Sequence, residues 1–180
     1  MSELFRLATV EDAKELLDLT LRAYEPIRKL GIKFPAATAT IELVKENIQN
    51  SRCYVLESDE KIVATITART YKEITNWPFL WWFAVDPLVK KKGVGSKLLT
   101  WVEETIIRDQ LGAPAVTLAT SDRHPWLIPM YERKGYERFF EVDQGEEGKE
   151  GKEGKGVFLR KILHPERYEL EKHKELKQAN

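Results

Sequence analysis

The segment between Phe83 and Ser96 has the residue types of a phosphate-binding turn. An apolar run ends at Asp86-Pro87, three lysines follow at 90–92, and Gly93-Val94-Gly95 leads into a helical pattern. Backbone N–H groups of a glycine-rich turn, neighbouring cations and the positive end of a helix dipole together suit a pyrophosphate group. The segment therefore predicts a site for a phosphorylated cofactor; an ordinary strand–turn–helix with solvated lysines is the alternative interpretation.

The spacing of the glycines disagrees with two common nucleotide-binding loops. A loop for nucleoside triphosphates needs Gly-x-x-x-x-Gly-Lys-Ser/Thr, but Lys90 stands five positions before Gly95, and Ser96 directly follows that glycine. A dinucleotide-binding loop needs a third glycine where this chain has Leu98. Neither loop therefore accounts for the segment.

A second segment, Pro129-Met130-Tyr131-Glu132-Arg133-Lys134-Gly135-Tyr136, follows a short apolar strand expected at 115–120. Together the two segments resemble the GCN5-related N-acetyltransferases, the GNAT superfamily. In that family a strand ending in Val-x-Pro leads into Arg/Gln-x-x-Gly-x-Gly/Ala and a helix, and a Tyr-Glu-Lys-Leu-Gly-Phe-like segment follows later. Here residues 90–95 and 131–136 occupy those two places, and the order of elements agrees from Leu4 to Leu163.

The resemblance implies an α/β fold: a single domain with a mixed, mostly antiparallel central sheet flanked by helices. The hydrophobic periodicity agrees with this fold. We expect an acetyltransferase domain over residues 1–163 and a charged, helix-forming tail over 164–180. Within the domain, we expect strands, with helices between them, at 5–8, 53–57, 62–70, 79–85, 115–120, 139–142 and 157–163.

Composition limits the partners and the location of the protein. The 29 basic and 29 acidic residues balance, so we expect neither nucleic acid nor an anionic membrane surface as a partner. The single cysteine, Cys53, cannot form an internal disulfide, which is typical of a reducing compartment and predicts the cytoplasm. We expect no metal, because three histidines and one cysteine form no recognised ligand spacing. The Gly-Lys-Glu run at 145–156 is expected to be a solvated loop.

The resemblance implies transfer of an acetyl group from acetyl-CoA to a primary amine by direct attack. In the family, the pantetheine arm lies along the central strand like an added strand, which here means Phe83, Ala84 and Val85. The Val85 N–H is then the donor to the thioester oxygen. The pyrophosphate site corresponds to the turn formed by Lys90, Lys91, Lys92, Gly93, Val94, Gly95 and Ser96.

Two further residues correspond to family positions near the reacting atoms. Tyr131 aligns with the general acid that protonates the leaving thiolate, and a packed helix tyrosine is its alternative interpretation. His124 stands where the family often has an asparagine that contacts the cofactor, and a histidine can also bond there or titrate. A helix cap is an equal alternative for His124.

The base that deprotonates the acceptor amine is not fixed by the resemblance. Many members carry a glutamate on the central strand, but residues 77–82 contain no carboxylate. Glu25, Glu73 and Asp122 are the alternatives, directly or through water, and the sequence favours none of them.

Aromatic residues near the first two helices and the central strand predict the acceptor pocket: Tyr24, Phe34, Trp77 and Trp81. Strand alternation should place Trp81 with Phe79 and Phe83 on one face, and Leu80 with Trp82 on the other. Such a pocket favours an apolar or aromatic amine, or a cation held by aromatic faces; packing in the core is the alternative interpretation for any one of the tryptophans.

Three functions are compatible with these residues. We expect an N-acetyltransferase for a small-molecule amine. A protein or peptide N-acetyltransferase is the first alternative, and it would need an open groove where this chain has bulky aromatic residues. A non-catalytic acyl-CoA-binding module is the second; the missing strand carboxylate favours it and Tyr131 opposes it. A homodimer is common in the family, but no interface can be identified in the sequence.

Overall fold

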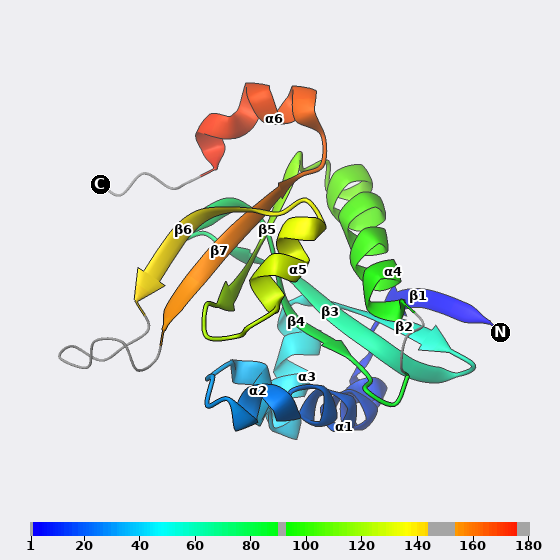
Figure 1. Ribbon diagram of the computed structural model, residues 1–180. Coiled ribbons are helices and arrows are strands. Elements are labelled where there is room, and N and C mark those ends of the chain that lie inside the picture. The colour runs from blue at the N-terminus through cyan, green and yellow to red at the C-terminus, as the bar shows by residue number, and fades with distance from the viewer. Residues whose placement is uncertain (1, 90–92, 144–153, 176–180) are drawn as a thin grey trace.

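The computed structural model describes residues 2–89, 93–143 and 154–175 (Figure 1). Its centre is a seven-stranded sheet in the order β1-β2-β3-β4-β5-β7-β6. Among the strand pairs of the described residues, only β4–β5 is parallel, so the expected mixed, mostly antiparallel sheet is confirmed. The strands are β1 (Glu3–Leu7), β2 (Arg52–Ser58), β3 (Lys61–Tyr71), β4 (Thr75–Val85), β5 (Ala115–Ser121), β6 (Glu137–Asp143) and β7 (Lys155–Ile162).

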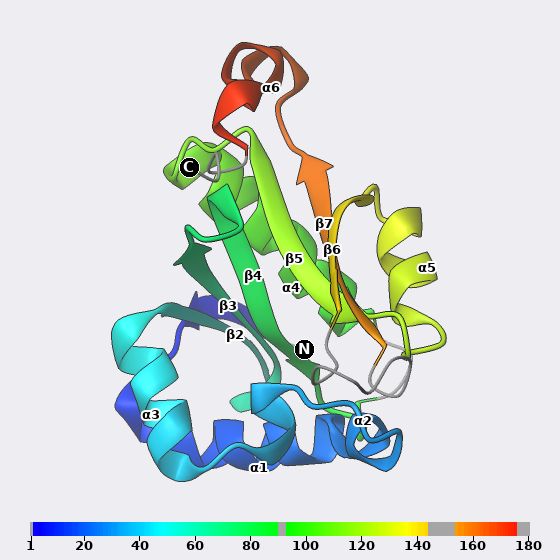
Figure 2. The same cartoon turned by 90° about the vertical axis from the view of Figure 1, so that its left-hand side faces the viewer.

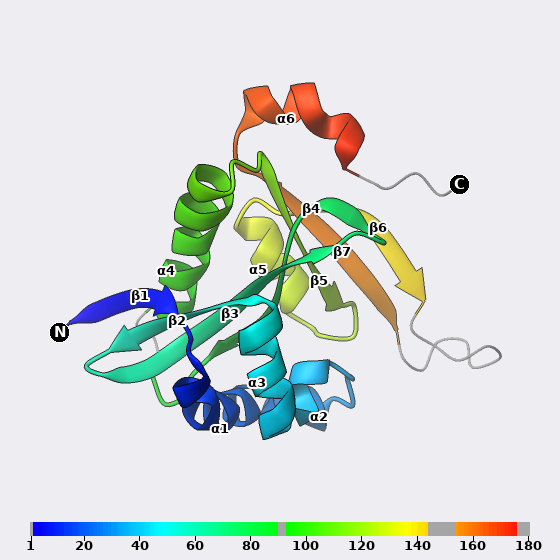
Figure 3. The same ribbon diagram turned by 180° about the vertical axis from the view of Figure 1, so that it is seen from behind.

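Helices cover both faces of the sheet. Figures 1 and 3 show α4 and α5 against one face and α1, α2 and α3 at the other. Each group of helices encloses its own apolar cluster against the strands. The helices are α1 (Ala13–Ala23), α2 (Glu25–Lys29), α3 (Ile41–Asn50), α4 (Val94–Trp101), α5 (Leu127–Arg133) and α6 (Pro165–Glu171), with shorter or irregular turns η1 (Val10–Asp12), η2 (Pro35–Thr38), η3 (Val102–Gln110) and η4 (Lys172–Lys174).

The glycine-rich segment leads into a long helix, as the sequence predicts. α4 continues directly into η3, a nine-residue stretch of π-helix. Within the described parts of the chain, no helix is long and apolar enough to cross a membrane.

A bulge in β4 changes the direction of its side chains. Thr67 pairs with Trp81 and Thr65 with Ala84, so β4 has one residue more than β3 between these pairs. Trp82 takes up the difference with a φ of 54°, a conformation that is strained for a bulky side chain. Its Nε1 donates to Thr20 Oγ1 of α1 at 3.0 Å, which holds the ring in place.

The expected alternation of side chains along β4 is therefore wrong. Trp81 and Trp82 both pack into the cluster beneath α1 and α3. Leu80 and Phe83 pack instead against the cluster beneath α4 and α5. The extra residue of a bulge reverses the alternation after it, and it places two consecutive indoles on one side.

Beyond Leu80 the two parallel strands separate, and we call the gap between them the fork. β4 and β5 pair only at Phe79 with Thr117 and Leu80 with Leu118. β4 then runs on to Val85, while β5 continues to Ser121 paired with β7 on its other side. Figure 2 shows the two strands diverging. An edge of β4 inside the sheet is thus left for another partner.

The opposite end of the sheet is covered by α6, and we call it the closed end. Trp77 lies there in a small cluster with Ala115 and Tyr168. Arg160 pairs with Glu175 close to this cluster. The tail is helical over 165–171, within the range where the sequence predicts a helix.

Candidate active site

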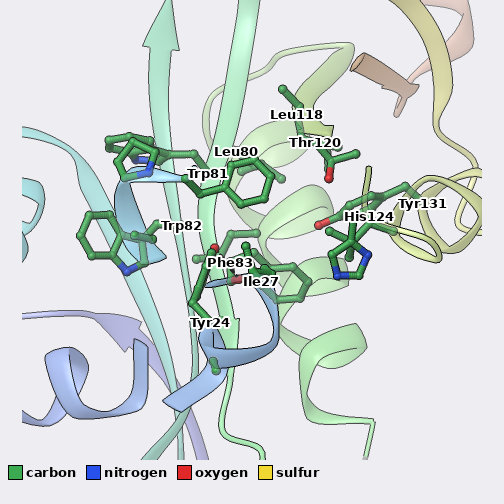
Figure 4. Close-up of a pocket in the computed structure, with 18 of the residues that line it drawn as sticks. Tyr24, Ile27, Leu80, Trp81, Trp82, Phe83, Leu118, Thr120, His124 and Tyr131 are labelled. Atoms are coloured by element: carbon green, nitrogen blue, oxygen red, sulfur yellow. Dashed lines mark hydrogen bonds between the residues drawn. The ribbon is translucent and has the colours of Figure 1, made fainter. Parts of the chain in front are cut away.

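A cavity of about 690 Å³ lies at the fork. Figure 4 shows β4 residues on one side of it and Thr120, His124 and Tyr131 on the other. Eight of the sixteen sequence-predicted site residues line it, namely Tyr24, Phe34, Trp81, Phe83, Ala84, Val85, His124 and Tyr131. The fork and the segments around it thus bring together residues that are more than one hundred positions apart in the chain.

One of the expected site residues lies elsewhere. Trp77 does not line the cavity but packs against Tyr168 at the closed end, with ring centroids 6.4 Å apart. β4 begins at Thr75, four positions earlier than expected. Trp77 therefore lies on the part of β4 that precedes the fork, near the closed end. Lys90, Lys91 and Lys92 are outside the described residues.

The fork edge of β4 carries backbone groups with a defined direction. Asp86 N donates to Val63 O of β3 at 2.9 Å, so the neighbouring Val85 N–H is directed to the other edge, into the fork. The Phe83 carbonyl also faces away from β3 and accepts a hydrogen bond from Tyr24 Oη at 3.0 Å. An extended ligand placed along this edge would therefore find a hydrogen-bond donor in the Val85 N–H and an acceptor in the Phe83 carbonyl.

The N-terminus of α4 adjoins this edge. Gly93 is its N-cap in a left-handed conformation, with a φ of 64°, and has no side chain to cap the helix. The N–H groups of Val94, Gly95 and Ser96 belong to the first turn, where the helix supplies no acceptor. A Cβ on Gly95 would lie 2.7 Å from Val85 Cγ2, so glycine is what allows this close approach to β4.

Lys134 adds a cation to this turn and was not foreseen as a site residue. Its Nζ donates to Ser96 Oγ at 2.6 Å, from the C-terminal end of α5. The sequence signal was present, because Lys134 belongs to the second motif. Helix-terminal N–H groups with a neighbouring ammonium form an anion site of the kind that the sequence predicts.

Tyr131 is held by a chain of buried contacts. Its ring meets Tyr136 edge-on at 5.6 Å, and Tyr136 Oη donates to the buried Glu103 at 2.6 Å. Lys161 Nζ donates to the other oxygen of Glu103 at 2.9 Å. Burial raises the pKa of Tyr131 above the ordinary phenol value, so its hydroxyl stays protonated near neutral pH. In Figure 4 this hydroxyl points into the cavity.

Three buried polar atoms of the cavity wall have no hydrogen-bond partner in the described part of the chain: Trp81 Nε1, Thr120 Oγ1 and His124 Nδ1. Leaving such a group unpaired costs about 1–3 kcal/mol each, so their position favours a ligand that bonds to them. Burial also lowers the pKa of His124, which keeps the imidazole neutral at pH 7. Its ring packs edge-on against Trp126, with ring centroids 4.4 Å apart.

The charge of the cavity wall is positive. Arg69 and Lys33 line it, and the described lining residues include no aspartate or glutamate. The three carboxylates considered as bases lie outside it: Glu25 pairs with Lys29, Asp122 accepts from the Lys155 N–H, and Glu73 is exposed in the β3–β4 turn. Arg69 belongs to no motif, and sequence reasoning missed it.

No group of three or more metal-ligating side chains occurs among the described residues.

The site combines four features. An open strand edge lies beside an uncapped helix end, a protonated phenol faces that edge, and a cavity with aromatic and cationic walls adjoins them. The site has the parts needed to hold an extended anionic donor and to bring an acceptor to it.

Comparison with known proteins agrees with this arrangement. Residues 13–136 match the acetyltransferase (GNAT) family, and the chain belongs to that family of acetyltransferases. It is 57% identical to an S-(2-succino)cysteine N-acetyltransferase of Bacillus subtilis (strain 168) over 150 residues, 81% of this chain and 91% of that protein. It is 50% identical to an S-alkylcysteine N-acetyltransferase of the same organism over 171 residues, 92% of each chain.

Solved structures share the fold. The PaiA N-acetyltransferase of Thermoplasma acidophilum, in complex with coenzyme A, superposes with a TM-score of 0.67 at 16% identity, over 90% of this chain and 99% of that one. The fold class derived from the sequence is therefore confirmed.

Proposed function

We propose that this protein transfers the acetyl group of acetyl-CoA to the primary amine of a small amino acid, an S-substituted cysteine. The observation that carries the proposal is the charge of the cavity, which Arg69 and Lys33 line and to which the described lining residues contribute no acid. A polyamine or an aminoglycoside would need acidic partners, whereas an amino acid brings its own carboxylate. The two Bacillus relatives, named for S-substituted cysteines, support the same class of acceptor.

The donor fits the fork and the adjoining turn. We place the pantetheine arm along β4, where the Val85 N–H and the Phe83 carbonyl present a donor and an acceptor. The pyrophosphate lies at the N–H groups of Val94, Gly95 and Ser96, with Lys134 as a counter-charge. The lysines at 90–92 and Gly93 complete this turn in the proposal, and Ala84 supplies the strand backbone between the two contacts.

Each step of the reaction uses one group of the chain. The acceptor nitrogen forms a bond to the thioester carbon, and the Val85 N–H donates to the carbonyl oxygen as it becomes negative. The C–S bond then breaks, and Tyr131 Oη gives its proton to the departing sulfur. His124, neutral because burial lowers its pKa, accepts the proton that the acceptor ammonium must lose.

The proposal includes the wider setting of the enzyme. Residues 1–163 form the catalytic domain, and 164–180 form a tail whose α6 covers the closed end. The site needs no metal, and neither nucleic acid nor a membrane is a partner. We propose a cytoplasmic location, which the single, buried and unpaired Cys53 supports. A homodimer remains an alternative to the monomer.

The test is an acceptor panel with acetyl-CoA, in which released CoA is measured with a thiol reagent and the product by mass spectrometry. The panel contains S-(2-succino)cysteine, S-methylcysteine, spermidine and two peptides, one with a free N-terminus and one with a free lysine. We expect acetylation of the cysteine derivatives at the α-amine. Acetylation of the peptides only would contradict the proposal in favour of a protein acetyltransferase. Binding of acetyl-CoA without transfer to any amine would favour a non-catalytic module.

A further inference from the structure

The Arg69 guanidinium lies within a set of aromatic rings at the cavity wall. Its central carbon is 4.3 Å from the ring centroid of Trp81, 5.3 Å from that of Tyr71 and 6.0 Å from that of Phe79. Within the described parts of the chain, it makes no ion pair and no hydrogen bond to an acceptor. Aromatic faces hold the plane of a guanidinium but leave the N–H groups at its rim unused.

Such an arginine is suited to bind a carboxylate. The five N–H donors of a guanidinium match the two oxygens of a carboxylate in a bidentate pair. The rings around Arg69 restrict its rotamers, so less freedom is lost when an anion binds. Arg69 is partly buried in a cavity whose described lining residues offer no competing acid. The charge is therefore available to an incoming ligand.

The position of Arg69 along the sheet indicates which carboxylate it meets. Arg69 pairs with Phe79, and four residues of strand, about 13 Å at the usual rise, separate Phe79 from Phe83. The guanidinium lies over Trp81, between these two. The reacting amine belongs near Val85 and Tyr131, beyond Phe83 on the same strand.

The two kinds of carboxylate in an S-substituted cysteine lie at different distances from its amine. Its α-carboxylate is two bonds from the amine nitrogen and stays close to the reacting centre. A carboxylate on the sulfur substituent is at least five bonds away and extends along β4 toward Trp81. On the basis of the proposed function, we propose that Arg69 binds a carboxylate of the S-substituent. Arg69 thereby selects cysteines with an acidic substituent over those with an alkyl substituent.

The test compares two acceptors and three proteins. S-(2-succino)cysteine carries substituent carboxylates and S-methylcysteine carries none, whereas both share the α-amine and the α-carboxylate. The proteins are the wild type, Arg69→Gln, and Lys72→Gln as a control at an exposed lysine of the β3–β4 turn, outside the cavity lining. We expect Arg69→Gln to lower kcat/KM for S-(2-succino)cysteine roughly 10- to 100-fold, mainly through KM, as for loss of a charged hydrogen-bonded pair. With S-methylcysteine the change should stay below about threefold.

The control variant and a binding measurement complete the design. Lys72→Gln should change kcat/KM for both acceptors by less than about threefold, as expected for an exposed residue outside the site. Thermal unfolding and acetyl-CoA affinity should be the same for all three proteins. Calorimetry of S-(2-succino)cysteine with the CoA-loaded proteins should show the weakening at Arg69→Gln without any chemical step.

The outcomes separate this inference from the proposed function. Equal losses with both acceptors would overturn the inference, because Arg69 would then bind the shared α-carboxylate or support the fold. Unchanged kinetics and binding in Arg69→Gln, or the same selective loss in Lys72→Gln, would also overturn it. A wild-type protein that binds S-(2-succino)cysteine through Arg69 but acetylates no cysteine derivative contradicts only the proposed function. A wild-type protein that does not bind it contradicts both.

Discussion

Arg69 and Arg160 both lie among aromatic rings, at opposite ends of one sheet. They differ in whether a carboxylate neutralises the guanidinium. Arg160 lies 5.3 Å from the Tyr168 ring centroid and 5.8 Å from that of Phe139, and it pairs with Glu175. Arg69 has three rings near it and, among the described residues, no carboxylate partner. Aromatic packing thus positions both cations, but only the closed end supplies the counter-charge.

The comparison indicates how stability and function are divided along the sheet. At the closed end, Glu175, which follows α6 and η4, contacts both Arg160 and Tyr168. At the fork, polar atoms of Trp81, Thr120 and His124 are left without partners in the described chain. Changes at the fork should therefore alter turnover and binding more than unfolding, and changes at the closed end should do the reverse.

The largest effect is expected at Tyr131. Tyr131→Phe removes the proton donor and keeps the ring, so kcat should fall by roughly 10²–10⁴, the usual contribution of a general acid. The thermal midpoint and acetyl-CoA affinity should remain near the wild-type values. Tyr136→Phe is the matched control: it leaves Glu103 with one fewer hydrogen bond and should lower stability by about 1–3 kcal/mol. Unchanged kcat in Tyr131→Phe would remove Tyr131 from the mechanism.

A smaller effect is expected at His124. The imidazole accepts a proton only when neutral, so kcat/KM should fall as the pH drops through its pKa, which burial places below the ordinary 6.5. His124→Asn keeps hydrogen-bonding groups but cannot titrate in this range. It should abolish this limb of the pH profile and lower kcat/KM at pH 7 by about tenfold to a hundredfold, the low end for a general base.

The pH profiles of both proteins, with acetyl-CoA affinity measured beside them, check this prediction. A variant that keeps the acidic limb would assign that limb to another group. A variant with full turnover and weakened acetyl-CoA binding would favour a cofactor contact for His124 in place of a base.

A moderate effect on the donor is expected at Gly95. In Gly95→Ala the new methyl group would lie 2.7 Å from Val85 Cγ2, so α4 or β4 must shift. Overpacking of this kind costs about 1–3 kcal/mol, and acetyl-CoA affinity should fall roughly tenfold. Thr100→Ala, at an exposed position of the same helix, should leave affinity unchanged. Equal affinity in both variants would mean that the turn tolerates displacement.

The smallest effect on activity is expected at the closed end. Tyr168→Phe removes the hydrogen bond from Tyr168 Oη to Glu175, 2.8 Å in length. Stability should fall by about 1 kcal/mol, or roughly 2–4 °C in thermal midpoint for a domain of this size, while kcat/KM stays the same. A loss of turnover without a loss of stability would contradict the view that the closed end supports stability and the fork supports function.

This contribution of Tyr168 should also depend on pH. Burial and the hydrogen bond to Glu175 raise the pKa of Tyr168 to about 12. The stabilisation is therefore complete below the ordinary phenol pKa of about 10 and is lost as the pH rises through 12. The difference in stability between wild type and Tyr168→Phe should shrink over that interval.

Sequence patterns predicted most of the fold because each strand and helix has its own apolar period. The hairpin of β2 and β3, the helix after the glycines and the final pair of strands follow directly from such periods. The two motifs predicted that the end of β4 and α5 belong to one site, and residues of both elements line the cavity. These predictions depend on local sequence, which carries both backbone preference and spacing.

The remaining features depend on distant contacts. The bulge at Trp82 is stabilised by Thr20, which lies 62 positions earlier, so no local pattern of β4 reveals it. The placement of Trp77 in the acceptor pocket assumed a shorter strand than β4. Arg69 acquires its surroundings from register with Phe79 and from Tyr71 and Trp81. Positions such as these become evident only when the sheet is assembled.

The two-pair contact between β4 and β5 gives the sheet a seam, with β1–β4 on one side and β5–β7 on the other. A pantetheine arm lying in the fork would act as a guest strand that joins the two half-sheets. Donor concentration would then govern not only turnover but also the cohesion of the fold, by about 2.7 kcal/mol at one hundred times the dissociation constant. In a cell, the enzyme would be most resistant to unfolding and proteolysis when acetyl-CoA is abundant, so its persistence would follow the supply of its own donor.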